Sequence, residues 1–82
     1  PAAAGRGLAT EAVRALVDTA FTVYGLRRLV ARIDAENTRS IALAERLGMR
    51  REAHLVENEW FKGCWSDELD YALLSREWTV RA

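Results

Sequence analysis

The sequence is poor in cysteine, proline, methionine and histidine, with one of each among its 82 residues. A single cysteine, Cys64, excludes an internal disulfide and a metal cluster built from thiolates, and it is typical of a reducing, cytoplasmic protein. Net charge is also absent, because 12 Lys and Arg balance 12 Asp and Glu. The balance argues against nucleic acid or an anionic membrane surface as a partner. No apolar run is long enough to span a bilayer.

The first residues of the sequence show no features of a targeting signal. Pro1-Ala2-Ala3-Ala4 has no initiator methionine and no charged region followed by an apolar one, so we expect no signal peptide. The missing methionine suggests a piece of something longer. With 50% apolar and 29% charged residues, the composition is that of an ordinary soluble globular protein of one domain or less.

Apolar spacing predicts a helix over residues 5–24, with an apolar face built from Ala9, Ala12, Val13, Leu16, Val17, Ala20, Phe21 and Tyr24. Gly25 suits a left-handed cap at its end. Gly5 and Gly7 are poor helix formers, and we therefore expect them in a loop that opens the helix.

The rest of the chain alternates strands and a helix. Residues 28–34 read as a strand, and Asn37 is a good N-cap for a helix over about 38–47 that Gly48 ends. Strands over about 50–60 and 65–75 follow, joined by a turn at residues 61–64 in which Gly63 supplies a positive φ. The predicted order is loop, helix, strand, helix, strand, strand: an α/β fold with a mixed sheet and an antiparallel C-terminal hairpin.

The segment from Gly5 to Thr10 directly precedes a helix. Free backbone N–H groups at a helix start, together with the helix dipole, favour a phosphate group. A simple helix-start turn explains the same residues, because Gly-x-Gly alone is a weak signal. The segment is neither a Walker loop, since Gly-Lys-Ser/Thr is missing, nor a dinucleotide fingerprint, since Thr10 stands where the third Gly would be.

Taken together, the blocks of the chain resemble the GNAT superfamily of N-acyltransferases, and most of all its ribosomal-protein N-terminal acetyltransferase branch. The blocks are, in order, residues 1–12, Asp34–Ser40, Glu45–Arg50, Lys62-Gly63, Asp67, Tyr71–Leu74 and Glu77-Trp78. The resemblance covers nearly the whole chain. It identifies residues 1–82 as the C-terminal, acyl-CoA-binding half of the domain, with the N-terminal half absent and with Ala2 where the superfamily has Gln or Arg.

The resemblance implies acetyl-CoA, or another acyl-CoA, as co-substrate and no metal. The CoA diphosphate would bind at the start of the first helix, on Gly5, Arg6, Gly7, Leu8, Ala9 and Thr10. Asn37 would hold the pantetheine arm, and Ser40 would protonate the departing thiolate. Without the resemblance, Asn37 and Ser40 read as ordinary helix-start residues that bond local backbone.

Glu59 is the predicted base. In the branch that the chain resembles, a Glu stands 19 residues after the Ser, which corresponds here to Glu59, and deprotonates the acceptor amine directly or through water. Trp60 and Phe61 beside it could desolvate its carboxylate and make it more basic. The alternative to a catalytic role is that Glu59 is an ordinary solvated carboxylate on a strand edge. His54, Cys64 and the three tryptophans read as surface, turn and packing residues, and Tyr71 reads as a core residue in preference to a second proton donor.

Three functions remain open from the sequence. The first is acyl transfer to a primary amine, on a small molecule or a protein N-terminus, by direct attack. The second is CoA or nucleotide binding without catalysis. The third is a half-domain that dimerises or swaps through the exposed edge of residues 28–34. We expect the acyltransferase interpretation to depend on free backbone donors at Gly5–Thr10, and to fail if that stretch is continuous helix.

Overall fold

The computed structural model describes the backbone of residues 2–81 and the side chains of residues 10–78. Its elements run in the order α1 (Ala2–Thr22), β1 (Arg28–Asp34), α2 (Thr38–Arg46), β2 (Arg50–Phe61), β3 (Cys64–Leu74) and α3 (Ser75–Arg81). The order confirms the predicted α/β fold. The helix α3 was not predicted from the sequence, since the last predicted element was the strand that ends at about residue 75.

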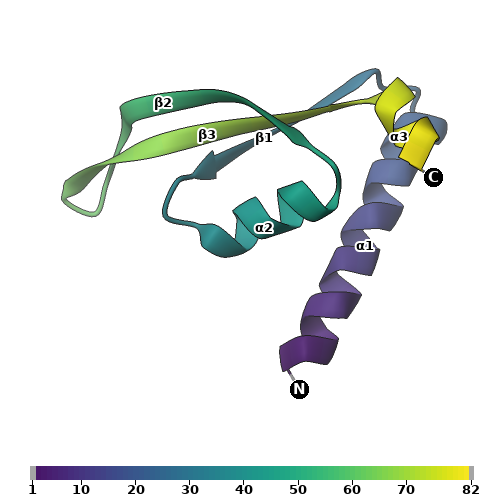
Figure 1. The fold of residues 1–82 in the computed structure, drawn as a ribbon, viewed down its shortest axis with the longest axis horizontal. Coiled ribbons are helices and arrows are strands. Elements are labelled where there is room, and N and C mark those ends of the chain that lie inside the picture. Colours follow the sequence, from purple (N-terminus) through teal and green to yellow (C-terminus); the bar gives the residue numbers. More distant parts are fainter. Residues whose placement is uncertain (1, 82) are drawn as a thin grey trace.

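The three strands form one sheet in the order β1-β3-β2 (Figure 1). Both pairings, β1 with β3 and β2 with β3, are antiparallel. The hairpin of β2 and β3 is therefore confirmed. The expected mixed character is not seen within residues 2–81, where no parallel pairing occurs. β1 lies at an edge of this sheet, as expected for residues 28–34.

Local signals explain where the elements end. Lys62 and Gly63 form the two-residue hairpin loop with φ values of 50° and 82°, the left-handed pair that matches the twist of two antiparallel strands. Gly25 after α1 and Gly48 after α2 have φ values of 65° and 86°. Both glycines thus adopt the conformation predicted for helix caps, in which a side chain would clash with the backbone.

The core lies where the helices meet one face of the sheet. One cluster joins α1, α2, β3 and α3 through Phe21, Leu47, Leu73 and Trp78. A second cluster packs α2 against β1 and β3 through Ile33, Ala44, Leu69 and Tyr71. The period of two in β3 places Leu69, Tyr71 and Leu73 on this face, and it places Glu68 and Asp70 on the opposite one.

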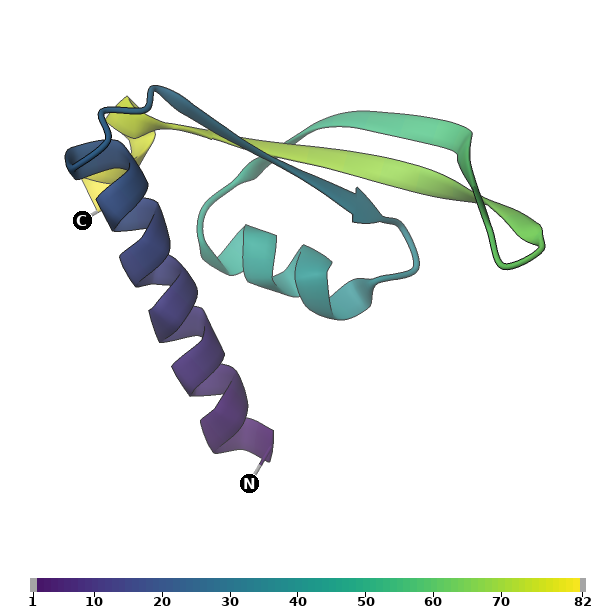
Figure 2. The ribbon, with the colours of Figure 1, turned by 180° about the vertical axis from the view of Figure 1, so that it is seen from behind.

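The molecule is flat and open. Its principal extents are 40 × 34 × 18 Å, and its radius of gyration is 14.1 Å, against roughly 12 Å for a compact domain of this length. Figures 1 and 2 show why: α1 is anchored beside α3 at its C-terminal end, and its N-terminal end projects away from the sheet. The position of α1 therefore depends on the contacts of its last turns.

Candidate active site

The front segment does not form the predicted loop. α1 begins at Ala2 and runs without interruption through Gly5 and Gly7. In an α-helix only the first four N–H groups lack an internal acceptor, so the amides from Arg6 to Thr10 are used within the helix. The prediction of a loop was wrong. Ala2-Ala3-Ala4 has the highest helix propensity of any such run, and it extends the helix past two poor helix formers.

The start of α2 matches the prediction. Asn37 is the N-cap, and its Oδ1 accepts the backbone N–H of Ser40 at 3.1 Å. Asp34, at the end of β1, fixes the turn between β1 and α2. Its Oδ1 accepts a hydrogen bond from the N–H of Glu36 at 2.7 Å, and its Oδ2 accepts one from the hydroxyl of Ser66 at 2.7 Å. These bonds hold the pKa of Asp34 below its ordinary value. The turn that presents Asn37 and Ser40 is therefore tied to β1 and β3.

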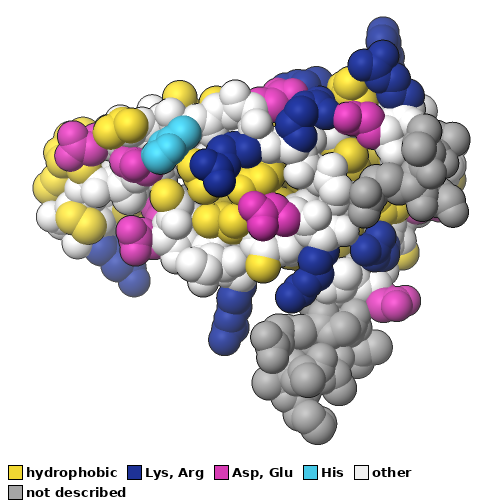
Figure 3. Space-filling model, in the orientation of Figure 1, with side chains coloured by type: hydrophobic (Ala, Val, Ile, Leu, Met, Phe, Trp, Pro, Cys, Tyr) yellow, Lys and Arg dark blue, Asp and Glu magenta, His cyan; other side chains and the backbone are white. Residues whose placement is uncertain are grey.

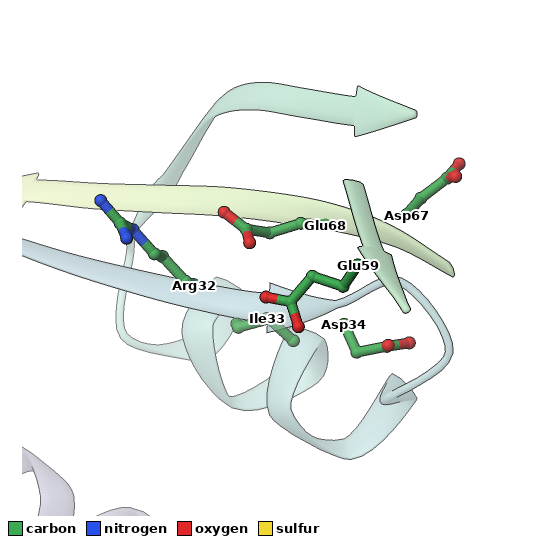
Figure 4. A pocket seen from close by; sticks show the side chains of 6 residues that line it. All are labelled: Arg32, Ile33, Asp34, Glu59, Asp67 and Glu68. Carbon is green, nitrogen blue, oxygen red and sulfur yellow. The ribbon is translucent and has the colours of Figure 1, made fainter. Parts of the chain in front are cut away.

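Glu59 lies on β2, opposite Ser66 of β3. It lines a shallow cavity of about 110 Å³ together with Arg32, Ile33, Asp34, Asp67 and Glu68. In Figure 4 the side chains of Glu59 and Glu68 extend toward the same side, whereas Asp67 points away from both. Glu59 is exposed and lies on an edge strand, as in the alternative reading, and it has acidic side chains and Arg32 as neighbours in this cavity.

Glu68 is the buried member of that group, with 7% of its surface exposed. Its Oε1 accepts Asn58 Nδ2 at 3.1 Å. Its pKa lies above the ordinary value, first because of a hydrogen bond with Asp70, then because of burial and because Glu59 is close. Asp70 Oδ1 is buried and accepts no hydrogen bond from the described residues. We define Glu59, Glu68 and Asp70 as the carboxylate cluster.

The sequence reading missed Glu68 and Asp70. The available signal was their spacing of two on a strand, which places both side chains on one face. The hairpin turn predicted at residues 61–64 also places Glu59 opposite Ser66, on the same face as Glu68 and Asp70, so the two signals together could have located the cluster.

The aromatic neighbours of Glu59 do not shield it. Trp60 and Trp65 form an edge-to-face pair across the hairpin, with ring centroids 5.3 Å apart. Trp60, Trp65 and Phe61 are 61%, 56% and 56% exposed, so they remain in contact with water. The expectation that Trp60 and Phe61 desolvate the Glu59 carboxylate was therefore wrong, although hairpin packing of Trp60 and Trp65 is confirmed.

The remaining candidates lie as predicted. Tyr71 is a core residue with 1% of its surface exposed, and its hydroxyl donates to Glu45 at 3.2 Å. Trp78 is buried in the core, and Cys64 is exposed where β3 begins. His54 lies on β2, where its Nε2 is 2.7 Å from Asp67 Oδ2.

The structure brings some predicted site residues together and leaves others apart. Asn37 and Ser40 share the start of α2, and Glu59 shares its cavity with Asp34, three residues before Asn37. The start of α1 is separate from both, as the two opposite views of the ribbon agree (Figures 1 and 2). The side chains of residues 5–9 lie outside the described part of the chain.

Charge is mixed over the face drawn in Figure 3, where basic and acidic side chains are interspersed among hydrophobic ones. The described residues contain no group of His, Cys, Asp and Glu arranged to hold a metal ion. None of the described helices is both long and apolar enough to cross a membrane.

Comparison with known proteins identifies what this arrangement resembles. Residues 1–50 match the model of the acetyltransferase (GNAT) domain. The uncharacterized N-acetyltransferase p20 of Bacillus licheniformis is 40% identical over 74 residues, which is 90% of this chain and 42% of that protein. YdaF of Bacillus subtilis (strain 168), which carries the name of a ribosomal N-acetyltransferase, is 34% identical over 90% of this chain and 40% of its own length.

A solved structure gives the same result for the fold. A chimeric form of the spermidine N-acetyltransferase SpeG from Vibrio cholerae superposes with a TM-score of 0.83 at 30% identity, over 99% of this chain and 48% of that one. The chain thus spans less than half the length of the relatives that it matches. The matched region includes both the front segment and the start of α2.

Proposed function

The chain belongs to the GNAT acetyltransferase family, and from this premise we propose that it supplies the acyl-CoA-binding part of an N-acyltransferase. The donor is acetyl-CoA or another acyl-CoA, and the acceptor is a primary amine. The observation that carries the proposal is the family match over residues 1–50, which spans the front segment and the Asn37 to Ser40 helix start. We expected the acyltransferase interpretation to fail if Gly5–Thr10 were continuous helix. The family match holds although this segment is helical, so the proposal does not depend on a preformed loop there.

The acyl-CoA site begins at α2. Asn37 uses its side-chain oxygen for the cap, and in our proposal its amide group bonds the pantetheine arm. Ser40, in the first turn of α2, donates a proton to the thiolate of CoA as it leaves. A hydroxyl is a weak acid, so its help depends on its position near the sulfur and on the positive end of the helix dipole.

The CoA diphosphate is assigned to backbone amides at the start of α1, within Gly5 to Thr10. Since α1 is helical there, binding uses the free amides of the first turn or unwinds part of it. Each Gly makes a helix about 1 kcal/mol less stable than Ala. Gly5 and Gly7 therefore lower the cost of unwinding this turn by about 2 kcal/mol relative to two alanines.

The chemical step is a direct transfer. The amine nitrogen attacks the thioester carbonyl, a C–N bond forms, and the C–S bond breaks. Glu59 takes the proton of the amine, directly or through a water molecule. Ser40 supplies a proton to the CoA sulfur and takes one back from water, to which Glu59 in turn releases its own. No covalent enzyme intermediate is needed. The position of Glu59 supports this role, because it lines the same cavity as Asp34, which ends β1 three residues before Asn37.

The acceptor class is a small cationic amine or a protein N-terminus. Related proteins carry both kinds of name, spermidine N-acetyltransferases and a ribosomal N-acetyltransferase. The carboxylate cluster favours an acceptor that carries additional positive charge. Turnover with spermidine and with a peptide N-terminus, compared side by side, decides between them.

A second candidate is a CoA-binding unit that pairs through a strand without catalysing. The observation behind it is that β1 is an edge of the sheet within the described residues, and an open edge recruits another strand. A homodimer formed in this way sediments at twice the monomer mass. A strictly monomeric protein would exclude it.

The experiment uses the protein as it occurs, with any residues that adjoin this chain. Acetyl-CoA should raise the melting temperature, and an amine acceptor should release free thiol from acetyl-CoA. Replacing Glu59→Gln should lower kcat by about 10²- to 10⁴-fold, the range for loss of a general base, and leave acetyl-CoA affinity unchanged. Ser40→Ala should also slow turnover.

Glu57→Gln and Thr38→Ala are the matched controls, since the first removes a neighbouring charge and the second a neighbouring hydroxyl, both outside the proposed machinery. Wild-type turnover in both Glu59→Gln and Ser40→Ala would refute the proposal. A melting temperature that does not respond to acetyl-CoA would do the same.

A further inference from the structure

β2 loses its register against β3 just before Glu59. Leu55 pairs with Glu68, and Glu59 pairs with Ser66, so the three residues 56–58 of β2 lie opposite the single residue Asp67. Within this bulge Glu57 has a φ of 48°, a left-handed conformation that costs a residue with a side chain roughly 1–2 kcal/mol. Such a bulge persists only if neighbouring groups hold it.

The side chain of Asp67 holds the bulge with both of its oxygens. Oδ1 accepts the backbone N–H of Glu57 at 2.8 Å, and Oδ2 lies 2.7 Å from His54 Nε2. These two bonds, the first being the stronger influence, keep the pKa of Asp67 below its ordinary value. The carboxylate thus spans from His54, two residues before the bulge, to the strained Glu57 at its centre.

The backbone of Asp67 contacts the other half of the site. Its carbonyl accepts the N–H of Ala35 at 2.9 Å, in the turn between β1 and α2. The preceding residue, Ser66, donates to Asp34 in the same turn. One dipeptide of β3 therefore contacts both the turn that presents Asn37 and the bulge that presents Glu59.

From these contacts we infer that Asp67 is a positioning residue that fixes Glu59 relative to the Asn37 and Ser40 helix start. The inference rests on the proposed function. Asp67 does not act on the substrate itself, because both oxygens of its side chain contact His54 and the backbone of Glu57. In Figure 4 its carboxylate points away from those of Glu59 and Glu68. It was one of the residues that carried the family resemblance, and the site chemistry left it without a role.

Glu59 is held from two sides: from the hairpin, where it pairs with Ser66, and from the bulge, where Asp67 holds Glu57. Without Asp67 the strained conformation of Glu57 relaxes, and the adjoining Glu59 shifts relative to Glu68. A displacement of about 1 Å in a reacting group can cost about 100-fold in rate.

The test compares Asp67→Ala with Asp67→Asn. The Asn side chain keeps an oxygen for the Glu57 N–H, whereas Ala removes the clamp. We expect Asp67→Ala to lower kcat about 10- to 100-fold with KM for acetyl-CoA within twofold, and Asp67→Asn to retain most of the activity. Amide exchange at Glu57 should accelerate in Asp67→Ala only.

The decisive measurement repeats each change in a Glu59→Gln background. A residue that acts through Glu59 has nothing left to position there, so Asp67→Ala should cause no further loss. An equal loss in both backgrounds would show a general structural role and overturn the inference. Where Asp67→Ala fails to fold, the exposed His54→Ala takes its place, with a fall of roughly 2- to 10-fold expected in the wild-type background only.

The outcomes also separate this inference from the function on which it rests. If Glu59→Gln and Ser40→Ala both turn over like wild type, the proposed function is wrong. If those two are slow and Asp67→Ala keeps full activity, the function stands and the positioning role is wrong.

Discussion

Trp78 anchors α1, and its replacement gives the sharpest test of the packing. The ring is 7% exposed, lies 6.3 Å from the ring of Phe21, and donates from Nε1 to Asp18 Oδ1 at 3.2 Å. Trp78→Ala should cost about 3–5 kcal/mol. A chain of this length has a total stability of roughly 4–12 kcal/mol, so the loss is a large fraction of the whole.

Trp78→Phe is the more informative change. It keeps an aromatic ring against Phe21 and removes the hydrogen bond to Asp18. Because Asp18 is exposed, water replaces the lost donor, and the bond itself should be worth about 1 kcal/mol. The smaller ring leaves a cavity that adds a similar amount, so we expect a total loss of about 2 kcal/mol.

Urea unfolding, followed by far-ultraviolet circular dichroism, measures this loss as a shift of about 1 M in the midpoint. A double-mutant cycle with Asp18→Ala isolates the hydrogen bond, with a coupling energy of about 0.5–1.5 kcal/mol expected. Asp18→Ala alone should be nearly neutral, because Ala favours the helix. A coupling energy below about 0.3 kcal/mol, the limit for independent sites, would refute the assigned contact.

Three further changes test other parts of the structure. Hydrogen bonds from Arg28, and then from Arg50, lower the pKa of Glu52 to about 2. The stability that this group contributes is present above its ordinary pKa of 4.5 and should be lost as pH falls toward 2. Glu52→Gln should weaken this pH dependence when the unfolding midpoint is measured over an acid titration. Glu68 has a raised pKa, so the stability that its protonated form contributes is lost as pH rises above 4.5. The Glu68→Gln variant should therefore melt at a higher temperature than wild type at pH 7.5. A lower melting temperature at that pH would contradict the assigned proximity of Glu68 to the other carboxylates. Gly63 has a φ of 82° with open space around it, so Gly63→Ala should cost about 1 kcal/mol through backbone strain alone, and unchanged thermal stability would show that the turn relaxes freely.

The elements that could be predicted from the sequence are those fixed by local chemistry. Asn37, Gly48 and the Lys62-Gly63 turn each determine their own backbone conformation, and the structure places them as expected. Alternation in β3 likewise places Leu69, Tyr71 and Leu73 in the core, although Glu68 and Ala72 on the opposite face are buried as well. The start of α1 differs from the prediction because the three alanines before Gly5 have a high helix propensity, which extends the helix through the two glycines.

What could not be predicted depends on contacts between distant residues. The bulge at 56–58 depends on Asp67 from another strand, since Asp67 Oδ1 accepts the N–H of Glu57. α3 had a local signal that was missed, since Ser75 precedes Glu77, whose side chain accepts the N–H of Leu74 at 2.8 Å. Its anchoring role, however, comes from Trp78 meeting α1.

The three tryptophans divide into two optical environments at opposite ends of the molecule. Trp60 and Trp65 are exposed near the hairpin tip, and Trp78 is buried between α3 and α1. Their emission therefore has a long-wavelength component from the tip and a short-wavelength component from the helix junction. A ligand that reorders α1 should alter the short-wavelength component alone, so the protein contains an intrinsic fluorescent reporter that needs no label.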